Sequence, residues 1–351
     1  MSSAIEFRHV NPELYRHPLE RVAKARIEMI PGYYKALDLI TENVGFKMER
    51  QAEIASMAKV GSGVYGKLFD AWNNVQAAFG LADIPLHISF DSPVSWCIRG
   101  NNEHPVVIID GKWLDILPER EMKALLAHQA GSVRLGNATY LAAADFFRTL
   151  ASYSGIVGAP ASVMTWGIES WRKYALYSAD RAAALSVGDP DAMLALLARI
   201  SGGNIGAWGG ISDPEQLRIQ GIEATSLQQD RATTRLQRFA MVMSRQNHAG
   251  LIRRVDLSDW FAGGNPARIL EGALTEPETP NAKTESDASA QTDDPGLAFW
   301  GEFASASPDE GASCNSRCPM MDVFGMAEKG MSTFWKAGQN FLKTFQDKKN
   351  C

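Results

Sequence analysis

The chain has 351 residues and a mass of 38.4 kDa, with 45 % hydrophobic and 21 % charged residues. These values predict a soluble globular protein with one large domain and appendages, or with two domains. A formal net charge of −5 argues against a nucleic-acid-binding protein, which normally carries a basic excess. Four cysteines are too few for a disulfide scaffold, so free thiols in a reducing compartment are expected.

Two stretches bear on location. Glu6, Arg8 and His9 interrupt the apolar run that a signal peptide needs, so a cytoplasmic protein is expected. The uncharged stretch 149–168 is long enough to span a bilayer, but it is poor in Leu, Ile and Phe and contains Pro160. A buried helical hairpin is therefore favoured over a membrane span.

The first third of the chain combines helices with a small sheet. Apolar residues at helical spacing predict helices over 19–29, 31–44 and 64–81. Short β-type runs then follow at 86–90, 94–98 and 105–110, with a turn at 99–102 between the last two. These runs predict a small sheet directly before the next helix.

That next helix, predicted over 119–135, carries the most informative spacing in the chain. His128-Gln129-Ala130-Gly131-Ser132 has the spacing of the His-Glu-x-x-His motif of zinc peptidases. In that motif the two histidines lie on one helix face and bind the metal, while the glutamate takes a proton from metal-bound water. Here Ser132 replaces the second histidine and the amide Gln129 replaces the base. Only His128 remains a good zinc ligand.

The rest of the chain divides into helices, a linker and a tail. Helices are predicted over 141–168 and 170–187, with a turn at 155–160, and then over 189–199 and 227–243. We expect a compact domain over 1–272. Residues 273–318, acidic and polar between 275 and 294, are predicted to be a flexible linker. Apolar residues at three- and four-residue steps, with lysines between them, predict an amphipathic helix over 319–348.

Several of these features together resemble one family. The resemblance covers about residues 11–272, and the features that carry it are the opening Asn-Pro-Glu-Leu-Tyr-Arg-His-Pro-Leu at 11–19, the sheet, the central helix, the run Leu-Tyr-Ser-Ala-Asp-Arg-Ala-Ala at 176–183, and the His248 segment. The chain resembles the gluzincin metallopeptidases of the HtpX and CAAX-prenyl-protease type. The resemblance implies a zincin-like fold of the α+β class, mainly α, with a small β-sheet beside the central helix. It also implies a sheet edge that holds an extended substrate.

The same resemblance implies that the zinc site is lost. The family's third ligand is a glutamate four residues before the aspartate of the Ser-Ala-Asp-Arg run, and here that position is Leu176. The implied ligand set is thus His128, Ser132 and Leu176, so no metal or other cofactor is expected. Asp180, which in the family orients a metal-binding histidine, is retained. His248 matches the histidine of a family His-Pro pair, and a structural role is expected for it.

Three functions follow from this pattern. The first is a catalytically inactive homologue, a pseudopeptidase, that binds a protein or peptide partner. The second is an enzyme: either a metalloendopeptidase with recruited ligands or a metal-independent hydrolase that uses Ser132, His128 and Asp180. Candidate recruited ligands are Glu103, His104, Asp145 and His248. The third function places the tail 319–348 on an anionic membrane surface or in a groove of another protein, unless it folds back onto its own domain.

Overall fold

The structure is a computed structural model, and it describes residues 6–28, 37, 57–90, 96–151, 158–202, 214–229, 250–274 and 276–277. Several predicted features lie outside these residues: nearly all of the helix at 31–44, most of the helix at 227–243, His248, the linker beyond Pro277 and the tail 319–348.

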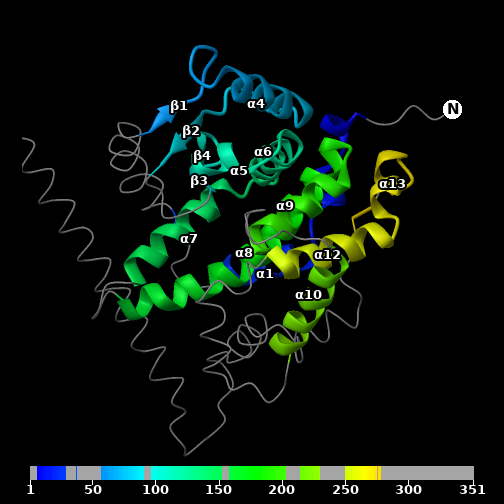
Figure 1. Ribbon diagram of the computed structural model, residues 1–351. Helices are drawn as coiled ribbons and strands as arrows, with labels where there is room; N and C mark the ends of the chain where they lie inside the picture. Colours follow the sequence, from blue (N-terminus) through cyan, green and yellow to red (C-terminus); the bar gives the residue numbers. More distant parts are fainter. Residues whose placement is uncertain are drawn as a thin grey trace, which may run out of the picture.

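The described chain is mainly helical with one small sheet, which confirms the predicted α+β class (Figure 1). Its strands are β1 (Ala58–Lys59), β2 (Leu86–Ser89), β3 (Trp96–Gly100) and β4 (Pro105–Asp110). The order is β1-β2-β4-β3, with β2 and β4 parallel and the other pairs antiparallel. β4 is buried along its whole length, in keeping with its continuous apolar run.

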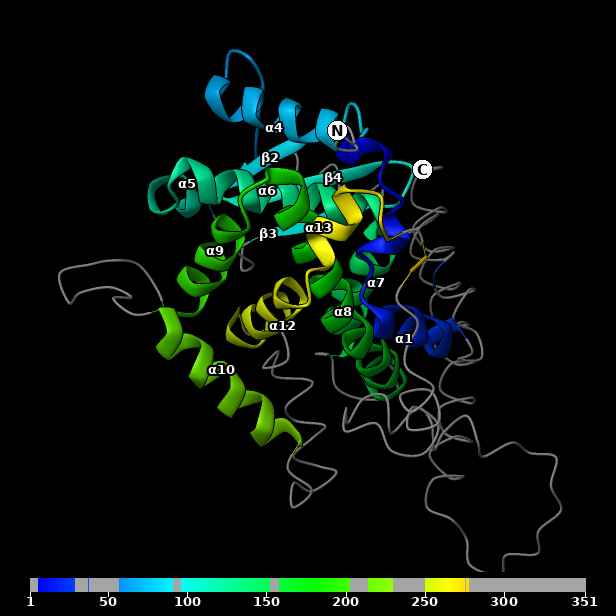
Figure 2. The same ribbon diagram turned by 90° about the vertical axis from the view of Figure 1, so that its right-hand side faces the viewer.

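The described helices differ in length, and α8 is the longest of them. They are α1 (Pro18–Glu28), α4 (Gly66–Ala78), α5 (Lys112–Ile116), α6 (Glu119–Arg134), α7 (Ala138–Ala151), α8 (Gly158–Val187), α9 (Pro190–Gly202), α10 (Pro214–Gln229), α12 (Gly250–Ala262) and α13 (Asn265–Leu270), preceded by short 3-10 turns at Phe7–His9 and Pro12–Leu14. α8 packs against α1, α6, α7, α9 and α12 (Figures 1 and 2). Residues from most of these helices and from the sheet form one continuous hydrophobic core.

α8 corrects the predicted break in the middle of the chain. It begins at Gly158, inside the turn predicted at 155–160, and it continues without interruption through Ile168 and Ser170. Pro160 lies in the first helical turn, where its missing N–H leaves no helical hydrogen bond unmade. α7 packs against α8. Within the described ranges, none of the helices has the length and apolar character needed to cross a membrane.

One further helix and one strand end differ from the predictions. α10 was not predicted, because Ile219 and Ile222 are exposed and no regular apolar stripe marks the helix. Its packing uses Gly221 instead, where a Cβ would lie 2.7 Å from the Leu251 carbonyl oxygen of α12. β3 extends to Gly100, two residues into the predicted turn, as Arg99 and Gly100 pair with β4.

The central contact between α6 and α8 depends on a small residue. A Cβ at Gly131 would lie 2.7 Å from the Ala182 Cβ and 3.4 Å from the Ala179 carbonyl oxygen. Glycine and alanine therefore allow the two helix backbones to approach closely here. This approach brings His128 of α6 next to the Ser-Ala-Asp-Arg run of α8.

Candidate functional site

His128 and Asp180 meet at the α6–α8 contact. His128 Nδ1 lies 2.8 Å from Asp180 Oδ1, and the two side chains are only 2 % and 1 % exposed. Trp96 of β3 presents its ring edge-to-face to the imidazole, with the ring centroids 6.5 Å apart. The lone histidine of the zinc-motif spacing thus lies in a closed part of the core, not at an open surface.

A third residue, Arg253 of α12, completes this cluster and was not anticipated from the sequence. Its Nε lies 2.8 Å from Asp180 Oδ2 and its Nη2 lies 2.6 Å from Asp180 Oδ1, so the guanidinium binds the carboxylate through two parallel hydrogen bonds. Burial alone would raise the pKa of Asp180, but Arg253, together with His128, lowers it below its ordinary value. Asp180 is therefore a carboxylate that Arg253 neutralises.

The charge state of His128 follows from this arrangement. Its pKa is lowered from the ordinary histidine value, chiefly by burial, with the nearby Arg253 cation acting in the same direction. Asp180 opposes that shift without reversing it. His128 is a neutral imidazole at neutral pH, held between a carboxylate and an aromatic ring.

The other residues of the implied zinc site do not complete a ligand set. Gln129 is buried and its Nε2 has no hydrogen-bond partner among the described residues. Ser132 is also buried and makes no hydrogen bond to His128 within the described chain. Leu176, with a hydrocarbon side chain, is partly exposed on α8. One imidazole, one hydroxyl and no carboxylate ligand do not fit the three-ligand open site of catalytic zinc.

Nor do the candidate recruited ligands assemble around His128. Asp145 is bound on both oxygens, by Arg99 Nη1 and by Arg172 Nη1, each at 2.8 Å. Glu103 and His104 lie in the turn between β3 and β4, where Asn101 accepts hydrogen bonds from both backbone N–H groups. The described residues contain no group of three or more His, Cys, Asp or Glu side chains arranged to hold a metal ion. His248 lies outside them.

The Ser-Ala-Asp-Arg run of α8 is a junction between helices. Ser178 Oγ accepts a hydrogen bond from the His17 N–H at 2.8 Å and donates one to Glu20, which ties α8 to α1. Ala179 faces the close approach at Gly131 of α6. Asp180 binds α6 and α12, as described above. Four consecutive residues on a helix point in different directions, so this run contacts several neighbours at once.

The last residue of the run, Arg181, makes a second link to α12. Its Nη2 lies 3.4 Å from Asp256 Oδ1, and its guanidinium stands 5.1 Å from the centre of the Trp260 ring. Asp256 also lies 3.3 Å from His17 Nε2. Charges of opposite sign on α8 and α12 are therefore paired twice, at Asp180 with Arg253 and at Arg181 with Asp256.

The opening motif at 11–19 docks into the same junction. Glu20, fully buried, accepts hydrogen bonds from Arg16 Nη1 at 2.7 Å and Asn137 Nδ2 at 2.9 Å, and burial raises its pKa. Arg16 Nη2 also binds the Leu135 carbonyl oxygen at the end of α6, at 2.9 Å. The motif thus anchors α1 to the end of α6 and to Ser178 of α8.

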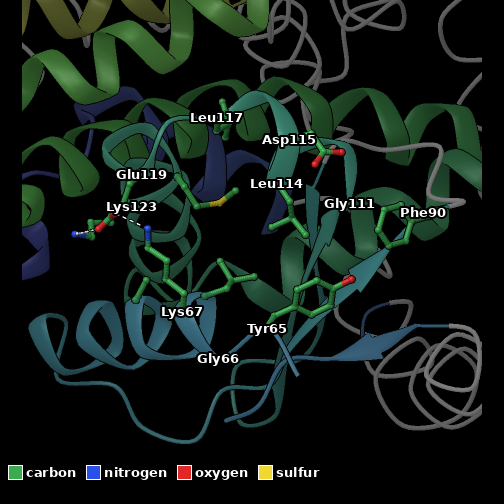
Figure 3. Close-up of a pocket in the computed structure, with 13 residues that line it drawn as sticks. Tyr65, Gly66, Lys67, Phe90, Gly111, Leu114, Asp115, Leu117, Glu119 and Lys123 are labelled. Atoms are coloured by element: carbon green, nitrogen blue, oxygen red, sulfur yellow. Dashed lines mark ion pairs between the residues drawn. The ribbon is translucent and has the colours of Figure 1, made fainter. Parts of the chain in front are cut away.

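The structure also has a cleft that is separate from the cluster around His128. It has a volume of about 630 Å³ and lies between α4, α5 and the first turn of α6 (Figure 3). Its wall is mainly apolar, and Lys67, Lys123, Glu119 and Asp115 supply its charges. None of the residues of the implied zinc site lines it.

Comparison with known proteins gives one distant relationship. The chain is 24 % identical over 213 residues to plastoglobule-localized metallopeptidase 48, chloroplastic, of Arabidopsis thaliana. This similarity supports a distant metallopeptidase-like relationship. The match covers 56 % of this chain and 58 % of the plant protein, so the chain spans little more than half of that relative's length. No protein-family model and no solved structure matches.

Proposed function

We propose that this metallopeptidase-like protein is a degenerate member of the HtpX and CAAX-prenyl-protease type that has lost zinc-dependent hydrolysis and binds a protein or peptide partner in the cytoplasm. The observation that carries the proposal is the buried His128–Asp180–Arg253 cluster at the position where the family's zinc site is expected.

Electrostatics supports this conclusion. In an active site a carboxylate beside a metal-bound histidine adds negative charge that favours the metal cation. Here Arg253 binds that carboxylate through both oxygens and brings a positive charge into the same cluster. A Zn²⁺ ion at His128 would face this cation with no compensating ligand charge from Ser132 or Leu176. Gln129, an amide, has no proton-accepting carboxylate to serve as general base.

Metal analysis combined with a hydrolysis assay tests the proposal. The full chain, stripped with a chelator and then equilibrated with zinc, should retain far less than one zinc per chain. It should cleave a reduced and alkylated unfolded protein no faster than its His128→Ala variant does. One zinc per chain, together with cleavage that His128→Ala abolishes, would overturn the proposal.

Restoring the ligands tests the implied relationship independently. The triple variant Gln129→Glu, Ser132→His and Leu176→Glu should bind one zinc per chain if α6 and α8 present these positions as the family requires. The matched control adds His128→Ala and should lose the metal. A triple variant that has an unchanged circular dichroism spectrum and binds no zinc, even when Arg253→Met also removes the nearby cation, would contradict the family relationship, whatever the outcome for the wild-type chain.

Partner binding needs its own measurement. The immobilised full chain should bind a reduced and alkylated unfolded protein, which presents extended segments, and should release it uncleaved. The same protein with its disulfides intact and its fold preserved is the control. Equal binding of the folded and unfolded forms, or of neither, would remove the partner-binding part of the proposal.

A further inference from the structure

The cleft beside α4 gathers much of the exposed apolar surface of the described chain. Among the described residues, five large hydrophobic side chains are clearly exposed, and three of them, Val64, Tyr65 and Phe90, lie at or next to this cleft. Phe90 is 68 % exposed and its ring lies against Gly111, where a Cβ would be 2.2 Å from the ring. Exposed apolar groups clustered around a concave surface are typical of a binding site.

Tyr65 is held over the cleft at a conformational cost. Its φ of 59° places it in the left-handed region, where a Cβ comes close to the following carbonyl oxygen and destabilises the backbone. It precedes the first residue of α4 without making a side-chain capping hydrogen bond. Glycine would serve this backbone position better. A binding role for the aromatic ring would explain why tyrosine, and not glycine, occupies this position.

The charges of the cleft are separated along its length. At one end Glu119 lies 2.8 Å from both Lys67 Nζ and Lys123 Nζ, and hydrogen bonds first from Lys123 and then from Lys67 lower its pKa to about 2. Two cations around one carboxylate leave that end positive. Asp115 lies apart from this group, across Leu114 and toward Phe90 (Figure 3). The cleft therefore has a positive end and a negative end with apolar wall between them.

The chain itself contains a segment with matching chemistry. In the tail 319–348, apolar residues recur at helical steps, including Phe324, Met331 and Phe334. The charges of the tail are also divided: its first half contains Asp322, Glu328 and one lysine, whereas its second half contains three lysines and Asp347. A helix of this length spans about 45 Å, so only part of the tail can lie in the cleft. With the acidic first half of the tail placed there, Asp322 and Glu328 would face the cationic end of the cleft.

The tether is long enough for this contact. About 40 residues of acidic and polar composition separate Pro277 from the tail. A flexible chain of that length spans roughly 35–40 Å, and a domain of this size has a radius of gyration of about 18 Å. The tail can therefore reach any part of its own domain at high effective concentration.

We propose that the cleft lined by Tyr65, Phe90 and Leu114 receives the tail 319–348 of the same chain as an amphipathic helix. The apolar stripe of the tail packs against the aromatic wall, with the acidic half of the tail toward Lys67 and Lys123. This contact is independent of the proposed loss of zinc chemistry, because it uses none of the residues around His128. It makes the tail an internal ligand that an external partner must displace.

Hydrogen exchange followed by mass spectrometry on the full chain tests this contact. Backbone amides of 320–346 should exchange at least about tenfold more slowly than in an unstructured peptide. Tyr65→Gly should remove most of that protection while leaving the stability of the domain equal or higher, since it relieves the left-handed residue. Ile219→Ala, which removes an equally exposed apolar side chain on α10, is the matched control and should change nothing in the tail.

A reciprocal variant and two further conditions complete the test. Phe334→Asp in the tail should speed exchange in residues 66–71 and 112–117 of the cleft. The inference is overturned if the tail is unprotected in the wild-type chain, or if its protection is unchanged in Tyr65→Gly. It is also overturned if protection depends on protein concentration, which indicates a second copy, or arises only with vesicles containing anionic lipid, which indicates a membrane.

Discussion

Arg253→Met gives the sharpest test of the buried cluster. Arg253 and Asp180 are 3 % and 1 % exposed and are joined at 2.6 and 2.8 Å, so the substitution leaves in the core a carboxylate that has lost its cation and keeps only the His128 contact. Removing one partner of a buried ion pair costs about 3–5 kcal/mol. This is a large part of the roughly 5–15 kcal/mol that stabilises a typical domain. The expected loss at pH 7 is therefore about 3–5 kcal/mol.

The pH dependence of this loss identifies its cause. In the wild-type chain the pKa of Asp180 is below its ordinary value, so its contribution to stability is complete above the unfolded-state pKa and declines as pH falls through the folded-state pKa. Without Arg253, burial raises that pKa and only His128 still opposes the shift, so the variant gains stability relative to the wild type when Asp180 is protonated. The difference between the two chains should therefore be smaller at pH 4.5 than at pH 7.

Urea unfolding followed by circular dichroism measures both effects. Arg218→Met, which breaks the exposed Glu215–Arg218 pair, is the control and should cost less than about 1 kcal/mol. The double variant Asp180→Asn with Arg253→Met should be less destabilised than Arg253→Met alone, because no unpaired charge remains. A loss below about 1 kcal/mol for Arg253→Met at pH 7, or a loss independent of pH, would refute this account of the cluster.

Two further predictions concern the same core. Burial lowers the pKa of both His17 and His128, so the free energy of unfolding should fall as pH drops below the unfolded-state pKa near 6.5. The expected decrease is up to about 1.4 kcal/mol per pH unit for each histidine. Urea midpoints measured from pH 8 to pH 5.5 check this dependence, and His128→Gln should reduce its slope. Gly131→Ala should destabilise the domain by about 1–3 kcal/mol because its Cβ would lie 2.7 Å from Ala182. Adding Ala182→Gly should recover part of that loss. The control is Gly66→Ala in α4, which has open space at its Cβ and should be neutral or stabilising. Equal effects of alanine at Gly131 and Gly66 would contradict the close approach of α6 and α8.

Local sequence patterns were enough to predict α6 and most of the sheet. Residues 105–110 were predicted as a strand and form β4 with the same bounds, and the predicted helix at 119–135 is α6 within one residue. The strand is a continuous apolar run and the helix has regular apolar spacing. In both segments the apolar residues are the ones that the fold buries. Where that agreement is missing, as at α10 with exposed Ile219 and Ile222, the pattern gave no signal.

The sequence by itself also determined which chemical groups are missing from the zinc-motif spacing, because Gln129, Ser132 and Leu176 lack the required donors whatever the fold. Only the tertiary structure decided which groups surround His128. Asp180 and Arg253 are 73 residues apart, and no spacing rule connects them. Their pairing depends on how α12 crosses α8, which long-range packing sets, and this packing makes Asp180 one half of a buried ion pair.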